Sequence, residues 1–419
     1  MKKNGFVRNR FVAIALLMVL AVVAGVVFAR YGGFGTGKCA DTEAFAQYAA
    51  PVDSFSVPGQ VRIVALGEAS HGNADFQQMK LDVFKMLVEK HGVRAFALEG
   101  DYGGCETVNR YIHGGGGPLT AATDAIGFTL YRTAQMDSLI AWMRTYNMTA
   151  PDGEDLRFYG FDMQRWERNY RYLLEAAEER DIDVATLRQQ NEDKEAHLDQ
   201  WLDAIVDVKH ELEQQEGTAN AVHHADILLQ NCGYGKTMGQ MNKGMAFRDS
   251  CMAENVRWIL AQEETRGNRC IMVAAHNGHI GRSAASHAAG KNMGSLLADA
   301  FGDAYFAIGT DFYKSRCNLP ANVSRTSRAN HLFYSHDPLA KAAMKCGLAS
   351  CWLDFSKIPA SSPLRQQVDG PVWMGSIGEG YSPLMALLPR SYRVWDSPAR
   401  LYDGMLFVAE AQPTSPRQQ

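Results

Sequence analysis

The chain has 419 residues, 46% of them hydrophobic, which is enough to bury a large core in one or two domains. Its 42 basic and 46 acidic residues give a formal net charge of −4, so no excess of charge favours a nucleic acid or an anionic lipid surface as a partner. The composition excludes a disordered chain and points away from proteins that bind polyanions.

The N-terminus combines basic residues with an apolar run. Four lysines and arginines within the first ten residues precede an uncharged stretch from Phe11 to Ala29, which Arg30 closes. A stretch of about 20 apolar residues can cross a bilayer as a helix, whereas a cleavable signal peptide usually has an apolar core of about 7–15 residues. Residues 1–30 therefore predict a signal-anchor. Cleavage after Ala29 is the alternative, because Val27 and Ala29 are small enough for a signal peptidase site.

Both interpretations of the N-terminus place the folded part of the chain outside the cytosol. Basic residues that precede an apolar run stay on the cytosolic side, so the expected location is the cytoplasmic membrane with a periplasmic or extracellular domain, or secretion after cleavage. An oxidising compartment lets disulfides persist. Among the eight cysteines, Cys346 and Cys351 are close enough in sequence to pair, and Cys39 is placed to link the N-terminal segment to the domain.

Glycine and proline mark the limits of the folded domain. Residues 31–38 are rich in glycine and predict a short linker. The domain is expected to span residues 39–410. Residues 411–419 form a polar tail with two prolines, which we expect to fray.

The order of strands and helices predicts the fold class. The short apolar run Val61–Leu66 ends at a glycine and is typical of a buried strand; Phe76–His91 has the apolar spacing of a helix, and Ala95–Leu98 follows as a second strand. Strand-like runs recur at Arg157–Phe161 and Cys270–Ala275. This order predicts an α/β fold with a mostly parallel central sheet flanked by helices.

A long segment without strand-like alternation separates the third and fourth of these strands. Residues 166–264 are rich in Glu, Lys, Gln and Leu and predict a large all-helical insertion. Its mixed charges are typical of solvated helix faces. Arg248-Asp249, in a helix expected over residues 245–262, is predicted to reach the sheet as a structural ion pair.

All four predicted strands are followed by ionisable side chains. Open α/β sheets bind ligands at the carboxyl ends of their strands, and a lone buried charge is costly. The occurrence of ionisable residues at the ends of all four strands therefore predicts a single site. Its residues are Glu68 and His71 after the first strand, Glu99 after the second, Asp162 after the third, and His276 and His279 after the fourth.

These residue types suit hydrolysis by water. Histidine titrates near neutral pH and can act as acid, base or hydrogen-bond donor. A Gly-x-Ser-x-Gly elbow does not occur on a strand-helix turn, so the sequence does not indicate a serine acyl-enzyme. Attack by a water molecule, activated by a histidine flanked by carboxylates, needs only the groups at the strand ends.

The same motifs resemble those of the erythromycin esterase family. The shared elements are Gly67-Glu68-Ala69-Ser70-His71-Gly72, the helix that bears Lys80, Leu98-Glu99, Gly160-Phe161-Asp162 and Ala275-His276-Asn277-Gly278-His279, in the order and approximate spacing of that family. Tyr402–Phe407 looks like the family's last strand. The resemblance covers most of residues 55–410.

The resemblance implies a role for each site residue. His71 is expected to be the general base, Glu68 and Glu99 to orient or polarise the water, and His276 and His279 to assist the carbonyl or the leaving group. Lys80 stands where the family often has an arginine, and Lys80 and Asp162 are the expected substrate- or oxyanion-binding residues. A lysine binds an oxyanion only as a point charge.

The resemblance also implies the substrate class. Members of this family are thought to cleave the lactone ester of macrolide antibiotics without a metal. We therefore expect a hydrolase without cofactor that acts on a small, bulky ester, does not bind nucleic acid and contacts a membrane only through its N-terminal helix.

Two alternatives remain open at this point. The histidines and glutamates of the site also make a suitable ligand set for zinc or manganese, which would give a metal-dependent hydrolase. The second alternative is an exported protein that binds a ligand and catalyses no reaction. Carboxylates beside histidines favour water activation, since capture of an apolar ligand does not require them.

Overall fold

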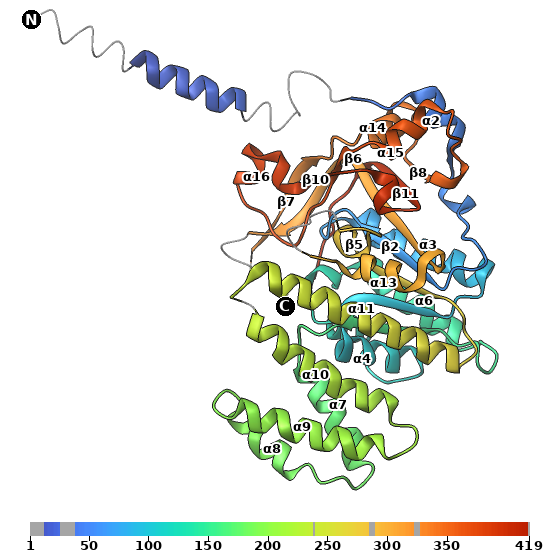
Figure 1. Cartoon of the computed structure of the whole chain (residues 1–419), viewed down its shortest axis with the longest axis vertical. Coiled ribbons are helices and arrows are strands. Elements are labelled where there is room, and N and C mark those ends of the chain that lie inside the picture. Colours follow the sequence, from blue (N-terminus) through green and yellow to red (C-terminus); the bar gives the residue numbers. More distant parts are fainter. Residues whose placement is uncertain (1–11, 26–37, 238, 285–289, 322–326, 418–419) are drawn as a thin grey trace, which may run out of the picture. The chain divides into compact units, whose positions relative to one another are not determined.

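The computed structural model describes residues 12–25, 38–237, 239–284, 290–321 and 327–417 (Figure 1). The chain divides into two compact units, each made of several segments. The first unit contains residues 1–54, 69–76 and 310–414, and the second contains residues 55–68, 77–309 and 415–419.

The second unit contains a parallel sheet. Its strands lie in the order β6-β2-β5-β3-β4, where β6 begins in this unit and continues in the other. All residues of β2 and β3 are buried, as expected for central strands covered on both faces. Because parallel strands end at the same edge, Glu68, Glu99, Asp162 and His276, at or near the ends of their strands, lie along that edge of the sheet. The strands are β2 (Ile63–Glu68), β3 (Ala95–Asp101), β4 (Arg157–Asp162), β5 (Ile271–His276) and β6 (Tyr305–Pro320).

Helices connect these strands, as an α/β fold requires. The predicted helix over residues 76–91 is α3, which begins two residues earlier than expected. Asp101 caps the next helix by accepting the backbone N–H of Gly104 at 2.7 Å. Outside the insertion, the helices between the parallel strands are α3 (Ala74–His91), α4 (Tyr102–Ile112), α5 (Leu119–Ala125), α6 (Ala134–Asn147), α12 (Asn277–Ile280) and α13 (Met293–Phe301).

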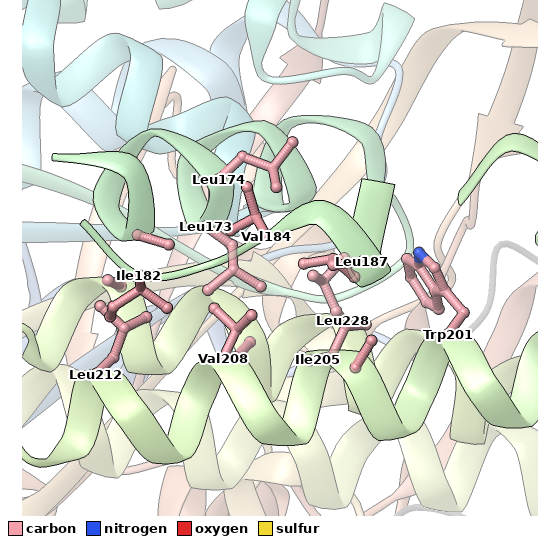
Figure 2. Close-up of a cluster of buried hydrophobic side chains, with 14 residues drawn as sticks. Leu173, Leu174, Ile182, Val184, Leu187, Trp201, Ile205, Val208, Leu212 and Leu228 are labelled. Carbon is pink, nitrogen blue, oxygen red and sulfur yellow. The ribbon is translucent and has the colours of Figure 1, made fainter. Parts of the chain in front are cut away.

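The segment between β4 and β5 is helical, as predicted, and α7 to α10 form a group at the lower end of the view in Figure 1. Figure 2 shows side chains of α7, α8, α9 and α10, among them Leu173, Leu187, Ile205 and Leu228, pointing toward one another. This cluster is a hydrophobic core built from the insertion's own residues. The helices are α7 (Glu167–Glu178), α8 (Ala185–Glu192), α9 (Leu198–Glu213), α10 (Ala219–Thr237) and α11 (Met241–Thr265).

The first unit adds antiparallel strands, of which the sequence analysis identified only β11. Their order is β1-β8-β11-β6, with β7 paired to β6. β8 is antiparallel to both β1 and β11, and the strand expected over residues 402–407 is β11. The elements of this unit are β1 (Ala49–Ala50), β7 (Arg328–Tyr334), β8 (Ser350–Asp354), β9 (Val372–Gly375), β10 (Arg393–Asp396), β11 (Gly404–Ala411), α2 (Thr42–Tyr48), α14 (Pro338–Lys345), α15 (Pro363–Asp369), α16 (Leu384–Leu387) and α17 (Pro398–Leu401).

The polar tail is bound, contrary to the expectation that it frays. In the first unit, the backbone N–H of Ala74 donates to the carbonyl of Gln412 at 2.8 Å, and that of Thr414 donates to Gly72 at 3.0 Å. In the second unit, Arg417 forms ion pairs with Asp124 and Asp137. Backbone hydrogen bonds explain the difference, because they depend little on the polar side chains that suggested a loose end.

The predictions for residues 1–30 and for a linker over residues 31–38 fall largely outside the described residues, which omit residues 1–11 and 26–37. Residues 12–25 form a helix. Of the helices in the described part of the chain, none has both the length and the apolar character needed to span a bilayer. All eight cysteines belong to the described part and are free thiols, so the pairing considered for Cys346 and Cys351 is absent.

Candidate active site

The carboxylate of Glu68, the last residue of β2, is buried and lies beside a lysine. Lys80 Nζ is 2.5 Å from Glu68 Oε2, and the Gln77 amide donates to the same oxygen at 3.1 Å. Gln77 and Lys80 are three residues apart on α3 and so share one face of the helix. Burial of a carboxylate is costly unless it is paired, and α3 supplies the pairing charge.

The Lys80 side chain is 2% exposed and also lies over an aromatic ring, with Nζ 5.9 Å from the centroid of Tyr131. The Tyr131 hydroxyl donates to the backbone carbonyl of Glu99 at 2.9 Å. The role of Lys80 in binding substrate stays a prediction; in the structure its charge is directed at Glu68.

The carboxylate of Glu99, near the end of β3, is held from several sides. Arg248 Nη2 donates to Oε1 at 2.7 Å, and the backbone N–H of His276 donates to Oε2 at 2.8 Å. His279 Nε2 is 3.4 Å from Oε1. A carboxylate with this many partners is held in one position.

Arg248 is a buried cation between two carboxylates. Its Nη2 lies 2.7 Å from Asp162 Oδ2 as well as from Glu99, and its Nε lies 3.3 Å from Asp162 Oδ1. Burial alone would lower the pKa of Arg248, but Asp162 and Glu99 outweigh it and hold the pKa well above its usual value. The ion pair predicted for Arg248 is therefore present, and it joins α11 to the ends of β3 and β4.

This ion pair also bears on the predicted role of Asp162. The Asp162 carboxylate accepts from the backbone of Met163 at 2.8 Å and from Gln164 at 2.6 Å, besides Arg248. Its contact with substrate remains a prediction. In the structure, the Asp162 carboxylate holds the Arg248 side chain in place.

His279 lies between two carboxylates. Its Nδ1 is 2.7 Å from Asp249 Oδ1, and its Nε2 faces Glu99 and Arg248 Nη1, the latter at 3.1 Å. Burial lowers the pKa of His279, but the charges of Glu99 and Asp249 more than offset this and raise it. Nε2 accepts from Arg248 when the ring is neutral and donates to Glu99 when the ring is charged.

His276, the last residue of β5, caps α12. Its Nδ1 accepts the backbone N–H of Gly278 at 3.2 Å, so the neutral ring carries its proton on Nε2. The end of β2 is packed against the same motif: a Cβ atom on Gly67 would lie 2.1 Å from Asn277 Oδ1. Only glycine allows this close approach.

His71 belongs to the first unit, in the turn that follows Glu68 by three residues. Its backbone N–H donates to the carbonyl of Ile377 at 3.3 Å. The neighbouring Ser70 hydroxyl lies 3.0 Å from Cys317 Sγ and is fully buried, which does not suit a nucleophile. The turn is thus fixed within its own unit.

Within the described ranges, no three His, Cys, Asp or Glu side chains are grouped so that they could hold a metal ion. The carboxylates of Glu68, Glu99 and Asp162 each pair with a lysine or arginine.

Gln77 was not identified from the sequence as a site residue, because it lies on a helix, away from the strand ends, where no pattern distinguishes it from an ordinary polar residue. The hydrogen bond from Tyr131 to the backbone of Glu99 was not predicted either. Asp249 was identified together with Arg248, but its partner His279 was not.

Comparisons with known proteins identify the family. The erythromycin esterase family model matches residues 88–411. Erythromycin esterase type II of Escherichia coli is 24% identical over 353 residues, which cover 72% of this chain and 82% of that protein. Glu68, His71 and Lys80 precede the residues matched by the family model.

Solved structures share the fold. A succinoglycan biosynthesis protein is 18% identical with a TM-score of 0.75, covering 90% of this chain and 98% of that one. A Bacillus cereus protein has a TM-score of 0.73 at 20% identity, covering 90% and 100%. A mutant of the erythromycin esterase EreC in its open conformation has a TM-score of 0.57 at 17% identity, covering 85% and 92%.

These similarities confirm the predicted α/β fold with its helical insertion. The family model covers most of the chain and includes four of the strand-end residues, Glu99, Asp162, His276 and His279. The chain therefore belongs to the erythromycin esterase family and, with it, to the ester hydrolases.

Proposed function

We propose that the chain hydrolyses a carboxylic ester or macrolactone of a small molecule, by direct attack of a water molecule that His71 activates. The observation that carries the proposal is the fixed carboxylate of Glu99, whose two oxygens accept hydrogen bonds from Arg248 and from the backbone of His276. A carboxylate held in this way can orient a water or an imidazole without a search among rotamers. Membership of the family supports the same class of reaction.

The proposed reaction has two steps. His71 accepts a proton from water as the water oxygen attacks the carbonyl carbon, and the carbonyl oxygen gains negative charge. The bond from carbon to the alcohol oxygen then breaks, and the proton passes from His71 to that oxygen. The products are an acid and an alcohol, and His71 returns to its starting state.

His276 is the proposed donor to the developing oxyanion. Its neutral ring carries the proton on Nε2, because Nδ1 accepts the backbone N–H of Gly278. A preorganised donor of this kind stabilises a tetrahedral intermediate by about 2.7–4 kcal/mol. Glu68 and Glu99, each paired with a cation, are proposed to orient the water and the histidines.

The substrate is proposed to be a bulky ester such as a macrolide. This follows from the name of the Escherichia coli relative, an erythromycin esterase, which shares 24% identity with the chain. The test is hydrolysis of a macrolide panel and of simple aryl esters by the full-length chain, its His71→Ala variant and a control, His210→Ala, whose imidazole is exposed on α9.

Each outcome of this test has a distinct meaning. Turnover that is lost in His71→Ala, kept in His210→Ala and unaffected by a chelator supports the proposal. Loss of turnover on chelation favours a metal-dependent hydrolase instead. Binding of a macrolide without turnover of any ester favours a ligand-binding protein.

We also propose that the N-terminal apolar run holds the chain at a membrane with the remaining residues exported. In the described part of this run, Leu17 and Leu20 are 65% and 61% exposed, and such side chains favour an apolar environment. Full-length chain is expected in carbonate-washed membranes, and a chain starting at Cys39 in the supernatant. Equal partition of the two forms would contradict the proposal.

A further inference from the structure

The last helix of the insertion presents two neighbouring charged side chains to the site. Arg248 and Asp249 are adjacent on α11, and both are buried, at 7% and 6% exposure. Adjacent helix residues point about 100° apart. Arg248 reaches Glu99 and Asp162, whereas Asp249 reaches His279.

Asp249 determines which nitrogen of His279 carries the hydrogen. A carboxylate only accepts hydrogen bonds, so the 2.7 Å contact requires a hydrogen on His279 Nδ1. Asp249 Oδ1 also accepts the backbone N–H of Met293 at 2.9 Å, which holds the carboxylate in place. The Nε2 atom of the ring is thereby turned toward Glu99 and Arg248.

The charges around His279 favour this arrangement. Glu99 of β3 and Asp249 of α11 are negative, and the positive charge of Arg248 is shared with Asp162. The pKa of His279 is raised because these two carboxylates outweigh the opposing effect of burial. Buried groups are little screened by solvent, so the series Asp249, His279 and Glu99 forms one coupled network.

We propose that Asp249 is a positioning residue, which acts through His279 to hold the Glu99 carboxylate in the position that ester hydrolysis requires. The insertion then contributes to the chemistry, because Arg248 and Asp249 of α11 constrain Glu99 together. The inference rests on the proposed function and concerns residues that act on Glu99, none of which needs to touch the substrate.

The decisive variant is Asp249→Asn. An amide of the same size can donate to Nδ1 of the imidazole and so stabilise the other tautomer. Nitrogen-15 shifts of the neutral His279 ring, assigned with a His279→Gln variant, are expected to report hydrogen on Nδ1 in the native chain and on Nε2 in Asp249→Asn. Asp207→Asn, an exposed change on α9, is the matched control and leaves the His279 shifts unchanged.

Kinetics separate positioning from stability. Asp249→Asn is expected to lower kcat on the best ester at least about 100-fold, in line with the loss of an oriented acid-base group, with KM within a few-fold of the native value. Asp249→Glu retains a carboxylate and is expected to recover part of kcat. In a Glu99→Gln background, Asp249→Asn is expected to have little further effect, because residues that act as a unit are not additive.

Two results would overturn the inference. One is an unchanged His279 tautomer in a folded Asp249→Asn chain, and the other is a changed tautomer with an unchanged kcat. If no ester is hydrolysed by the native chain, the proposed function fails, while the nitrogen-15 shifts still decide whether Asp249 orients His279.

Discussion

Lys80 Nζ lies 2.5 Å from Glu68 Oε2, and the two side chains are only 2% and 1% exposed. Such a pair contributes little net stability compared with apolar residues of the same shape, but removing one partner leaves a buried charge uncompensated. The stability of the contact between the end of β2 and α3 therefore depends on both members being present.

Lys80→Met is expected to lower the free energy of unfolding by about 3–5 kcal/mol. Adding Glu68→Gln to Lys80→Met should recover much of this loss, since the unpaired charge is removed. Chemical denaturation of the three chains measures the effect. Lys291→Met serves as the control, because the Lys291–Asp299 pair is exposed and is expected to contribute nothing measurable.

Gly67→Ala is expected to destabilise the chain by about 1–3 kcal/mol and to reduce hydrolysis, because its Cβ would lie 2.1 Å from Asn277 Oδ1. The movement needed to relieve this contact would shift Glu68 or the His276 turn. Thermal unfolding and ester turnover measure the two effects. Gly59→Ala, which meets no atom within 4 Å, is expected to change neither; equal effects of both substitutions would contradict this explanation.

A buried carboxyl pair in the first unit makes stability depend on pH. Ser335 and the backbone of Gly375 donate to Asp311 Oδ2 at 2.8 and 3.0 Å, and Asp337 is hydrogen-bonded to Asp311. Burial raises the pKa of Asp311 to about 6 and that of Asp337 well above its usual value, in the second case with the charge of Asp311 adding to the effect. Because the folded state holds these protons more tightly than the unfolded state, the pair stabilises the folded chain fully below about pH 4. This stabilisation is lost as the pH rises through about 6.

Asp337→Asn tests this pair. The amide of asparagine is neutral at every pH, so the variant does not need to keep a proton on residue 337 to remain folded. It is therefore expected to unfold at a higher temperature than the native chain at pH 7–8 and to lose that advantage near pH 4. Thermal melts of both chains from pH 4 to 8 measure the difference. A difference that does not vary with pH would show that the pair does not titrate in this range.

Deletion of residues 412–419 is expected to lower the melting temperature and to reduce ester hydrolysis. The deletion removes the backbone hydrogen bonds to Gly72 and Ala74, which flank the turn of His71, and the ion pairs of Arg417. Gln412→Ala keeps the backbone bonds and is the matched control. Full activity and an unchanged melting temperature in the deletion would rule out this role of the tail.

The strand-end residues could be predicted because a parallel sheet converts sequence order into spatial order. An apolar run followed by glycine and ionisable residues, as in Val61–Glu68, specifies both a buried strand and the edge at which its polar groups lie. Glu68, Glu99, Asp162 and His276 are the terminal or near-terminal residues of their strands in the structure. Their predicted roles, and that of His71, await the experiments above.

Contacts made by helix residues could not be predicted in the same way. A helix places a polar residue on one of several faces, and the partner is set by packing over long sequence separations, as between Asp249 and His279. Of the antiparallel strands of the first unit, β8 was missed because it pairs with β11 across about fifty residues without a turn signal. The tail was misjudged because its polar composition does not reveal backbone bonding.

The hydrophobic core of the insertion does not include its last helix. Leu173, Trp201 and Leu228 belong to a cluster formed by α7, α8, α9 and α10. The last helix, α11, instead carries Arg248 and Asp249, which bind the strand-end network. The packing of the insertion and the position of Glu99 thus depend on different residues of the same segment.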